Sequence, residues 1–351
     1  MATDTVKRRP QNAQLTVAVT GPTGDLGRAL VPALLRSRRI ARVVGMARRP
    51  FDPKSAGWQR FEYLQGDVAD RDAVRELVRG ADVVVHLAFA VLSASDATWE
   101  INVGGSRTVF EEAIEAGVRR IVYASSVAAY GFRPELPARI DEKQPALGSP
   151  EHPYSAQKAA VERALNALLE TAGARTQAWV LRPCIIAGPR ARTLIEELPY
   201  VRAARSLPGP LVRLARSAPL LRPVLPDPGV PFQLVHEDDV AQAFVAAVLG
   251  RGEPGPYNLA APGTLTITRL AHELGWHAVP VPRAALIAGG EALRRLPGAP
   301  AELAWVHALR RPVLMRTERA QKLLGWKPRH TALRTLRATI AAARAAGTPL
   351  V

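Results

Sequence analysis

The chain has almost no cysteine and no long apolar run. Its 351 residues include one cysteine, Cys184, so no disulfide can form within the chain. Arginine or proline interrupts every apolar stretch before it reaches the roughly 18 residues of a transmembrane helix. Residues 1–14 are polar and lack the apolar core of a signal peptide, so we expect a disordered leader. These absences predict a protein of the reducing cytoplasm with no membrane-spanning segment.

Acidic residues are also scarce. The chain has 31 Asp and Glu against 47 Lys and Arg, which gives a net charge of +16. A charge of this size can indicate nucleic-acid binding. Here the charge is almost all arginine, it is spread along the chain, and no nucleic-acid motif accompanies it. We therefore interpret it as a solvated surface, expect no nucleic-acid partner, and expect it to attract small anionic ligands.

Short apolar, β-rich runs alternate with helical patterns through the first half of the chain. The expected strands are 15–21, 41–48, 63–68, 81–90, 118–126 and 176–183, and the expected helices are 25–37, 70–80, 99–117 and 152–172. Strands that alternate with helices of this length predict an α/β fold: a doubly wound Rossmann-type parallel sheet with helices on both faces.

The pattern changes after Gly188. Residues 190–231 are rich in Pro, Arg and Leu, residues 232–250 return to a strand followed by a helix, and the next 80 residues or so mix short strands, turns and helices. We expect a smaller C-terminal substrate-binding subdomain over the carboxyl edge of the sheet, where open α/β sheets bind ligands. The predicted units are a Rossmann domain from 15–189 and 232–250, a subdomain from 190–231 and 251–330, and a C-terminal helix and tail at 331–351.

The segment "TGPTGDLG", residues 20–27, lies between the first predicted strand and the first predicted helix. Gly21 allows a tight turn, Gly24 lets the backbone approach a pyrophosphate, and Gly27 lets the helix pack closely on the strand. The amide groups and the dipole of the helix N-terminus then favour phosphate. The loop therefore predicts a dinucleotide site, with candidate contacts at Gly21, Thr23, Gly24, Asp25, Leu26 and Gly27.

The stretch "YSAQK" places Tyr154 and Lys158 four residues apart, on one face of a predicted helix. A free tyrosine titrates at about 10, too high for easy proton exchange at neutral pH. A neighbouring ammonium favours phenolate and would lower the pKa of Tyr154. The two residues are therefore a candidate acid–base pair.

Together these motifs resemble a known family. Gly-x-x-Gly-x-x-Gly followed by Tyr-x-x-x-Lys is similar to the short-chain dehydrogenase/reductase superfamily, and in particular to its extended branch of nucleotide-sugar epimerases and dehydratases. Further matching stretches follow in the family's order between residues 15 and 330: "GDVAD", "VVHLA", "NVGGSRTVFEEA", "SSVAAYG", "LRPCIIAGP", "VHEDDVA", "YNLA" and "LGWKP".

The resemblance implies roles for residues that spacing alone does not single out. Ser126 matches the active-site serine, which would orient the substrate oxygen and stabilise its charge. Asn102 matches an asparagine that helps to hold the proton-relay geometry, and Lys158 would also bind the nicotinamide ribose. The other implied cofactor contacts are Asp67 and Val68 at the adenine, Leu87 and Ala88 beside the ribose and nicotinamide, and Pro183. The resemblance also implies a homodimer through the helices at 100–117 and 153–172.

The end of the second predicted strand bears on the choice of cofactor. NAD-selective folds place an acidic residue there, which binds the ribose hydroxyls. This chain has Ala47, followed by Arg48 and Arg49. A guanidinium at this place can pair with a 2′-phosphate. We therefore expect NADP(H) to be favoured, with NAD(H) possible.

Two departures from the family pattern bear on the reaction. Val127 and Ala128 follow Ser126, where 4,6-dehydratases carry Asp-Glu, so we reject a dehydratase of that type. Phe232 stands where nucleotide-sugar enzymes usually carry an arginine that grips the diphosphate. Other arginines could replace it: Arg190, Arg192 or Arg213.

These features favour an NADP(H)-dependent oxidoreductase that interconverts a carbonyl and a secondary alcohol, with a small carbonyl, alcohol or sugar as its substrate. Two alternatives remain: a nucleotide-sugar epimerase with tightly bound NAD(P), and a non-catalytic dinucleotide-binding or sensing protein. The intact set of Ser126, Tyr154 and Lys158 disfavours the last of these.

Three further features receive structural interpretations. Ser125 is expected to pack at a strand end, and Cys184 is expected to be a small buried residue without a catalytic partner. The run His236–Asp239 could suggest a metal, but contiguous acids at a strand–helix junction more often form a helix N-cap and first turn. We therefore predict no metal site.

Overall fold

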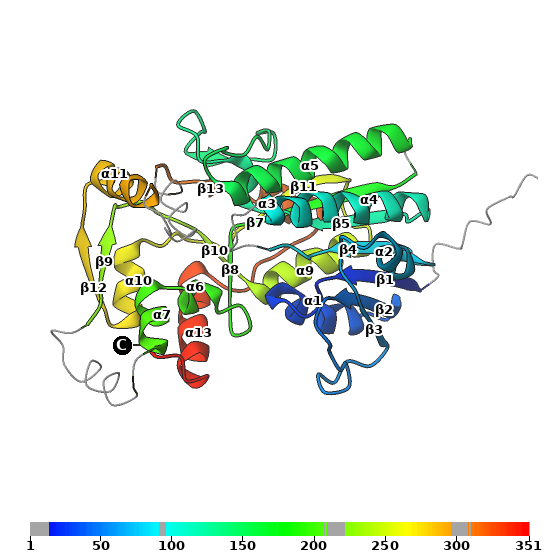
Figure 1. The fold of residues 1–351 in the computed structure, drawn as a ribbon, viewed down its shortest axis with the longest axis horizontal. Coiled ribbons are helices and arrows are strands. Elements are labelled where there is room, and N and C mark those ends of the chain that lie inside the picture. Colours follow the sequence, from blue (N-terminus) through cyan, green and yellow to red (C-terminus); the bar gives the residue numbers. More distant parts are fainter. Residues whose placement is uncertain are drawn as a thin grey trace, which may run out of the picture.

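The computed structural model describes residues 14–90, 96–173, 175–206, 208, 222–295, 308 and 310–350. Its centre is a seven-stranded sheet in the order β11-β7-β5-β4-β1-β2-β3, in which every pair of neighbours is parallel (Figure 1). The predicted doubly wound α/β fold is confirmed. The strands are β1 Leu15–Thr20, β2 Ile40–Ala47, β3 Phe61–Gln65, β4 Val83–His86, β5 Arg120–Ala124, β7 Gln177–Pro183 and β11 Gly255–Leu259.

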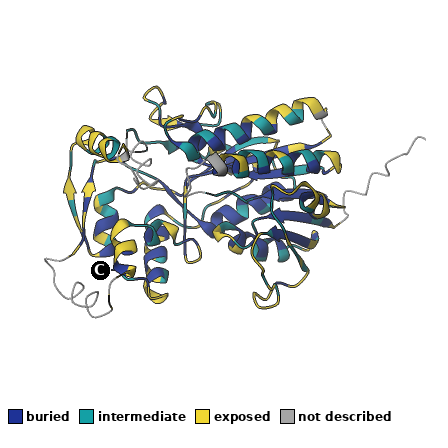
Figure 2. Cartoon of the chain, viewed as in Figure 1, coloured by how far each residue is buried: buried dark blue, intermediate teal, exposed yellow. Residues whose placement is uncertain are grey.

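Alternate residues of the strands face two separate apolar layers. Val17 and Val19 of β1 pack with α1 and α9, whereas Ala18 between them packs with α2, α4 and α5. Figure 2 shows burial concentrated in the sheet and in the helix faces that cover it. The helices are α1 Asp25–Leu35, α2 Arg71–Val78, α4 Gly105–Glu115, α5 Pro153–Ala172 and α9 Glu237–Val248.

Two predicted elements are shorter or less regular in the structure. The strand expected at 81–90 ends at His86: the amide of Leu87 still reaches the Thr20 carbonyl oxygen of β1, but those of Ala88 and Ala90 bond to the side chains of Thr20 and Asn102. The helix expected at 99–117 begins as α3 Asp96–Trp99, passes through a π-helical turn, η1 Glu100–Gly104, and continues as α4.

A third apolar cluster lies in the C-terminal part of the chain, centred on residues such as Leu234, Trp276 and Leu336. The last helix, α13 Ala332–Ala345, packs into this cluster. The strand β11 lies within the range assigned to the subdomain, but its pairing with β7 makes it the edge of the central sheet. The other elements are β6 Arg139–Ile140, β8 Ile185–Ala187, α6 Thr193–Glu196, α7 Pro199–Arg205, β9 Val224–Asp227, β10 Leu234–His236, α10 Ile267–Leu274, β12 His277–Pro280, α11 Arg283–Arg294, β13 Leu314–Met315 and α12 Glu318–Leu323.

Some of the predicted features fall on residues that the structure does not describe. The expected leader, except for Gln14, and Arg213 lie outside the described residues. None of the helices in the described ranges is long and apolar enough to cross a bilayer.

Candidate active site

The glycine-rich loop connects β1 to α1 as the sequence predicts. Gly21 has φ +71°, and a Cβ there would lie 3.0 Å from the backbone nitrogen of Ala88. A Cβ on Gly27 would lie 2.4 Å from the carbonyl oxygen of Pro22, so the helix approaches the loop more closely than any side chain would permit. These two positions therefore require glycine.

Helix α1 begins without a side-chain cap, because its N-cap residue is Gly24. The amide groups of the first turn, which includes Asp25 and Leu26, have no partner within a helix and are suited to an anion. This cradle fits a dinucleotide pyrophosphate. Thr23 lies in the loop, where its carbonyl oxygen accepts from Arg28 Nε at 2.9 Å. Asp25 Oδ2 accepts from the hydroxyl of Thr193 at 2.7 Å, which joins the loop to α6.

The start of the β2–β3 connection is held by its backbone. The carbonyl oxygen of Arg48 accepts from Gln65 Nε2 at 3.1 Å, and that of Arg49 accepts from the hydroxyl of Tyr63. Both arginines are exposed. Among the described residues, neither guanidinium has a hydrogen bond or ion pair. The two positive groups therefore project from an anchored backbone at the carboxyl end of β2.

The predicted adenine contacts, Asp67 and Val68, follow β3, the neighbour of β2. Asp67 Oδ1 accepts from the amide of Ala69 at 3.0 Å, so its carboxylate stabilises the turn before α2. Val68 packs against Gly105 so closely that a Cβ on this glycine would lie 2.7 Å from Val68 Cγ2. Pro183 is buried at the end of β7.

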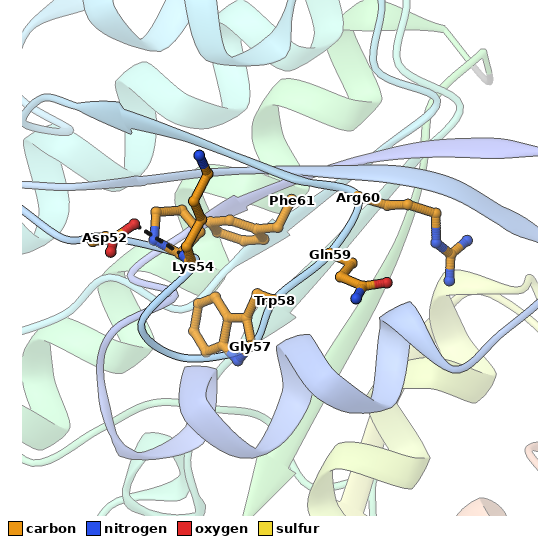
Figure 3. Close-up of a pocket in the computed structure, with 8 residues that line it drawn as sticks. Asp52, Lys54, Gly57, Trp58, Gln59, Arg60 and Phe61 are labelled. Carbon is orange, nitrogen blue, oxygen red and sulfur yellow. Dashed lines mark hydrogen bonds between the residues drawn. The ribbon is translucent and has the colours of Figure 1, made fainter.

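A surface pocket of about 510 Å³ lies on the β2–β3 connection (Figure 3). Trp58 and Phe61 contribute rings to its lining, and Lys54 is bonded through its amide to Asp52 Oδ1 at 3.0 Å. The strands β4, β1 and β2 separate β3 from β5, which precedes Ser126. The pocket is therefore distinct from the candidate catalytic residues.

Helix α5 places the predicted acid–base pair at the start of the helix. Pro153 occupies its first turn, and His152 Nδ1 caps it by accepting from the amide of Ser155 at 3.2 Å. Lys158 is buried, with Nζ donating to the carbonyl oxygen of Ala124 at 2.7 Å and to the hydroxyl of Tyr123 at 3.3 Å. Its Nζ also lies 3.5 Å from the ring centroid of Phe89.

The electrostatics of the pair differ from the sequence-based expectation. Burial lowers the pKa of Lys158 to about 7, although the nearby carboxylate of Glu162 opposes the change. Burial raises the pKa of Tyr154, and a hydrogen bond with Ser126 partly offsets this rise. The expected lowering of the Tyr154 pKa by Lys158 is not seen, because desolvation is the larger effect and Nζ is turned toward Ala124, 5.9 Å from the Tyr154 ring centroid.

Ser126 comes from the turn that follows β5. It is buried, and its hydroxyl caps the short helix η2 Val127–Tyr130 by accepting from the amide of Ala128 at 3.2 Å. The structure thus brings Ser126, Tyr154 and Lys158 together from two elements distant in sequence. Ser125 points elsewhere: its hydroxyl donates to Glu162 Oε1, as expected for a packing residue.

Asn102 lies in the π-helical turn and binds a neighbouring loop through its side chain. Its Oδ1 accepts from the amide of Ala90 at 2.8 Å, and its Nδ2 donates to the carbonyl oxygen of Ala90 at 2.9 Å and to Gln157 Oε1 at 2.8 Å. π-Helical turns are frequent at functional sites. The relay role implied for Asn102 stays a prediction.

The sequence did not predict a buried ion pair near Lys158. Glu162 forms an ion pair with Arg182 of β7, and both side chains are 6% exposed. Glu162 stands four residues after Lys158, so the same helical spacing that joins Tyr154 to Lys158 could have indicated it. Arg182 lies in β7 and Glu162 in α5, so no short sequence pattern predicts their contact.

Two of the three proposed substitutes for a diphosphate-binding arginine, those that the structure describes, are engaged elsewhere. Arg190 forms ion pairs with Glu237 and Asp238 at the start of α9, and Arg192 pairs with Glu196 at 3.1 Å. Phe232 packs against the third apolar cluster and pairs through its backbone with Leu265.

The interpretations of Cys184 and of the run at His236 agree with the structure. Cys184 is buried, and burial raises the pKa of its thiol. The run that starts at His236 is a helix N-terminus: His236 Nδ1 accepts from the amide of Asp238 at 3.1 Å, and three acids lie in the first turn of α9. Helices α4 and α5 lie side by side over one sheet face (Figure 1), and the homodimer through them stays a prediction.

The uncapped glycine loop after β1 and the Ser126, Tyr154 and Lys158 cluster at the same sheet edge define a Rossmann-type protein of the short-chain dehydrogenase/reductase class. Residues 17–260 match the model of the NAD dependent epimerase/dehydratase family. The chain belongs to this family.

The chain is also similar to two uncharacterized proteins and shares its fold with solved structures. The chain is 28% identical over 330 residues to an uncharacterized protein of Sinorhizobium fredii, covering 90% of this chain and 75% of that protein. It is 31% identical over 302 residues to an uncharacterized protein of Mycobacterium tuberculosis, covering 84% of this chain and 26% of that protein. UDP-glucose 4-epimerase from Thermotoga maritima shares the fold, with a TM-score of 0.70, 20% identity and coverage of 95% and 99% of the two chains.

Proposed function

We propose that this chain is an NADP(H)-dependent oxidoreductase that interconverts a carbonyl and a secondary alcohol. The observation that carries the proposal is the cluster of Ser126, Tyr154 and Lys158 at the carboxyl edge of the sheet, the same edge at which the uncapped N-terminus of α1 follows β1. Open parallel sheets bind their ligands at this edge. A non-catalytic binding protein would have no need of the cluster.

When bound, the nicotinamide cofactor supplies or accepts the hydride. Tyr154 gives its phenolic proton to the carbonyl oxygen, or removes the proton of the alcohol in the reverse direction. Ser126 orients that oxygen and donates a hydrogen bond to its developing charge. Lys158 places a titratable ammonium beside the site, and the pKa of about 7 means that its charge changes near neutral pH.

The surroundings favour a substrate without a nucleoside diphosphate. Phe232 occupies the place of the diphosphate-binding arginine, while Arg190 and Arg192 are held by acidic neighbours. Phe89 lies edge-on to Tyr154, with ring centroids 5.6 Å apart, and adds apolar surface at the reacting group. We therefore propose an apolar carbonyl or alcohol.

Partial relatives are in keeping with an apolar substrate. Sterol demethylase protein B of Methylococcus capsulatus is 31% identical over 194 residues, which cover 52% of this chain and 57% of that protein. The alternative, a nucleotide-sugar epimerase, is supported by structures such as MoeE5, which was solved with UDP-glucuronic acid and NAD.

A substrate panel distinguishes the two reactions. We expect stoichiometric loss of NADPH absorbance with apolar cyclic ketones, and no isomerisation of UDP-glucose or UDP-glucuronic acid. Isomerisation of a nucleotide sugar without net loss of NADPH, with cofactor retained through purification, would establish the epimerase instead.

Replacing Arg48 by alanine should reduce kcat/KM for NADPH by roughly 10- to 100-fold, because a hydrogen-bonded pair with a charged group contributes about 1.5–3 kcal/mol. The value for NADH should stay the same. Arg42→Ala is the matched control, since Arg42 is an exposed arginine of β2, the strand that precedes Arg48, and pairs with Glu62 at 3.2 Å. An unchanged NADPH/NADH ratio in Arg48→Ala, and in Arg49→Ala as well, would exclude these arginines as the 2′-phosphate site.

A further inference from the structure

We propose that His86, a buried histidine with no part in the proton transfer, is a positioning residue that closes a ring of hydrogen bonds around residues 87–90. The ring runs from Ala88 through Thr20, His86, Ser106 and Asn102 to Ala90. It joins the end of β1, the end of β4 and the start of α4, and it holds the four-residue segment at both ends.

The contacts on one side of His86 set the direction of the bonds. The hydroxyl oxygen of Thr20 accepts from the amides of Leu87 and Ala88, each at 3.2 Å, and the Leu87 amide is shared with the backbone carbonyl oxygen of Thr20 at the same distance. These two bonds use both of its lone pairs, so its one proton goes to His86 Nδ1, 2.7 Å away. Nδ1 is therefore an acceptor and carries no proton.

The contacts on the other side lead to the same tautomer independently. Ser106 Oγ bonds to the carbonyl oxygen of Asn102, which can only accept, so the serine proton lies on that bond. His86 Nε2, 2.9 Å from Ser106 Oγ, must then donate. All the bonds from Ala88 to the Asn102 carbonyl run in one direction, an arrangement in which neighbouring bonds strengthen one another.

The side chain of Asn102 closes the ring. It accepts from the amide and donates to the carbonyl of Ala90, two residues beyond Ala88. The surroundings favour the neutral imidazole: His86 is fully buried, its ring stacks on Tyr123 at 5.7 Å, and Phe110 lies edge-on at 5.4 Å. Burial and the positive charge of Lys158 both lower the pKa of His86, to about 3. The imidazole therefore stays neutral across the physiological pH range.

The position of the segment gives the ring its function. Residues 87–90 contact the phosphate loop at Gly21, where a Cβ would lie 3.0 Å from the nitrogen of Ala88, and they include Phe89, which contacts Lys158. The ring thus ties the segment between the candidate pyrophosphate loop and the catalytic lysine. This role rests on the proposed dinucleotide binding. It predicts that the ring determines the affinity for the cofactor and does not affect the preference between NADPH and NADH.

Two variants remove the hydroxyl groups on either side of His86 and leave the buried imidazole in place. Thr20→Val keeps the shape of the side chain and removes its hydroxyl, and Ser106→Ala removes the other hydroxyl. Thr20→Val removes three hydrogen bonds and Ser106→Ala removes two, and each change opens the ring at His86. Each should speed amide hydrogen exchange across 87–90 and raise the dissociation constants of NADPH and NADH alike, by at least the roughly 2- to 10-fold that the loss of one hydrogen bond costs. The double variant should show the effect of one single variant and not the product of both, because either change opens the same ring. Thr20→Ser, which keeps the hydroxyl, should restore exchange and binding.

Several outcomes would overturn the ring. These are wild-type exchange at 87–90 in both single variants, effects that multiply in the double variant, or a Thr20→Ser variant as impaired as Thr20→Val. Amide hydrogen exchange is measured on the purified protein without substrate. If both nucleotides bind but no carbonyl is reduced, the proposed reaction fails and the ring is still tested. If neither nucleotide binds, the hydrogen-exchange rates of residues 87–90 alone test the ring.

Discussion

Replacing Tyr154 by phenylalanine should lower kcat by roughly 10²- to 10⁴-fold, the usual contribution of a positioned general acid or base. The change removes one hydroxyl and keeps the ring, which contacts Phe89 edge-on. The dissociation constant of NADPH should therefore stay the same. Initial rates with the best ketone of the panel, together with fluorescence titration of NADPH, measure the two effects separately.

Tyr200→Phe is the matched control, because this tyrosine is exposed and, within the described part of the chain, its hydroxyl donates only to the backbone carbonyl of Val224, at 3.1 Å. It should leave kcat unchanged. A Tyr154→Phe enzyme with wild-type kcat would show that another group handles the proton, and the acid–base assignment would be wrong.

Replacing Lys158 by methionine should abolish turnover and, at about pH 6, stabilise the protein measured without added nucleotide. Burial lowers the pKa of Lys158 from its usual 10.5 to about 7, so folding must bring a charged ammonium out of water at acidic pH. That cost is of order a few kcal/mol. The lost hydrogen bonds to the Ala124 carbonyl and the Tyr123 hydroxyl each offset about 1 kcal/mol of the gain.

The pH dependence of this gain follows from the direction of the shift. Below about pH 7 the lysine is protonated in both the folded and the unfolded chain, and the cost is fully present. Between about 7 and 10.5 the unfolded chain binds the extra proton, so the stability of the wild type rises with pH. The advantage of Lys158→Met should therefore be largest at acidic pH and shrink as the pH rises through this window.

Thermal unfolding at several pH values measures the effect. Lys322→Met, at an exposed position of α12, should shift the unfolding temperature little at any pH. A Lys158→Met protein that is less stable than the wild type at acidic pH would show that Lys158 is held by interactions stronger than its desolvation cost. Conversely, a stabilised and inactive variant would identify a lysine kept for function at the expense of stability.

The parts of the site that follow from short-range rules were predicted from the sequence. The spacing of Gly21, Gly24 and Gly27 depends only on a turn and a helix start, and a spacing of four depends only on helical geometry. The seven-stranded sheet followed from the alternation of strands and helices, except for β11. Its residues come after the break in the pattern, and only pairing with β7 shows where they belong.

Other features depend on contacts between segments far apart in the chain. Glu162 and Arg182 meet across two elements, and Thr20 and Ser106 meet on either side of His86. The pKa of Tyr154 also depends on contacts between segments far apart in the chain. Sequence spacing suggested that Lys158 would lower it, but burial dominates in the structure.

The sequence by itself determined the fold class, the phosphate loop and the proximity of Tyr154 to Lys158, because each depends on periodicity or on steric limits within a few residues. Tertiary structure alone decided the engagement of Arg190 by acids, the pairing of Glu162 with Arg182, and the ring through His86. These depend on which side chains burial brings together and deprives of water. Desolvation and partner choice are properties of the packed molecule, and no local pattern encodes them.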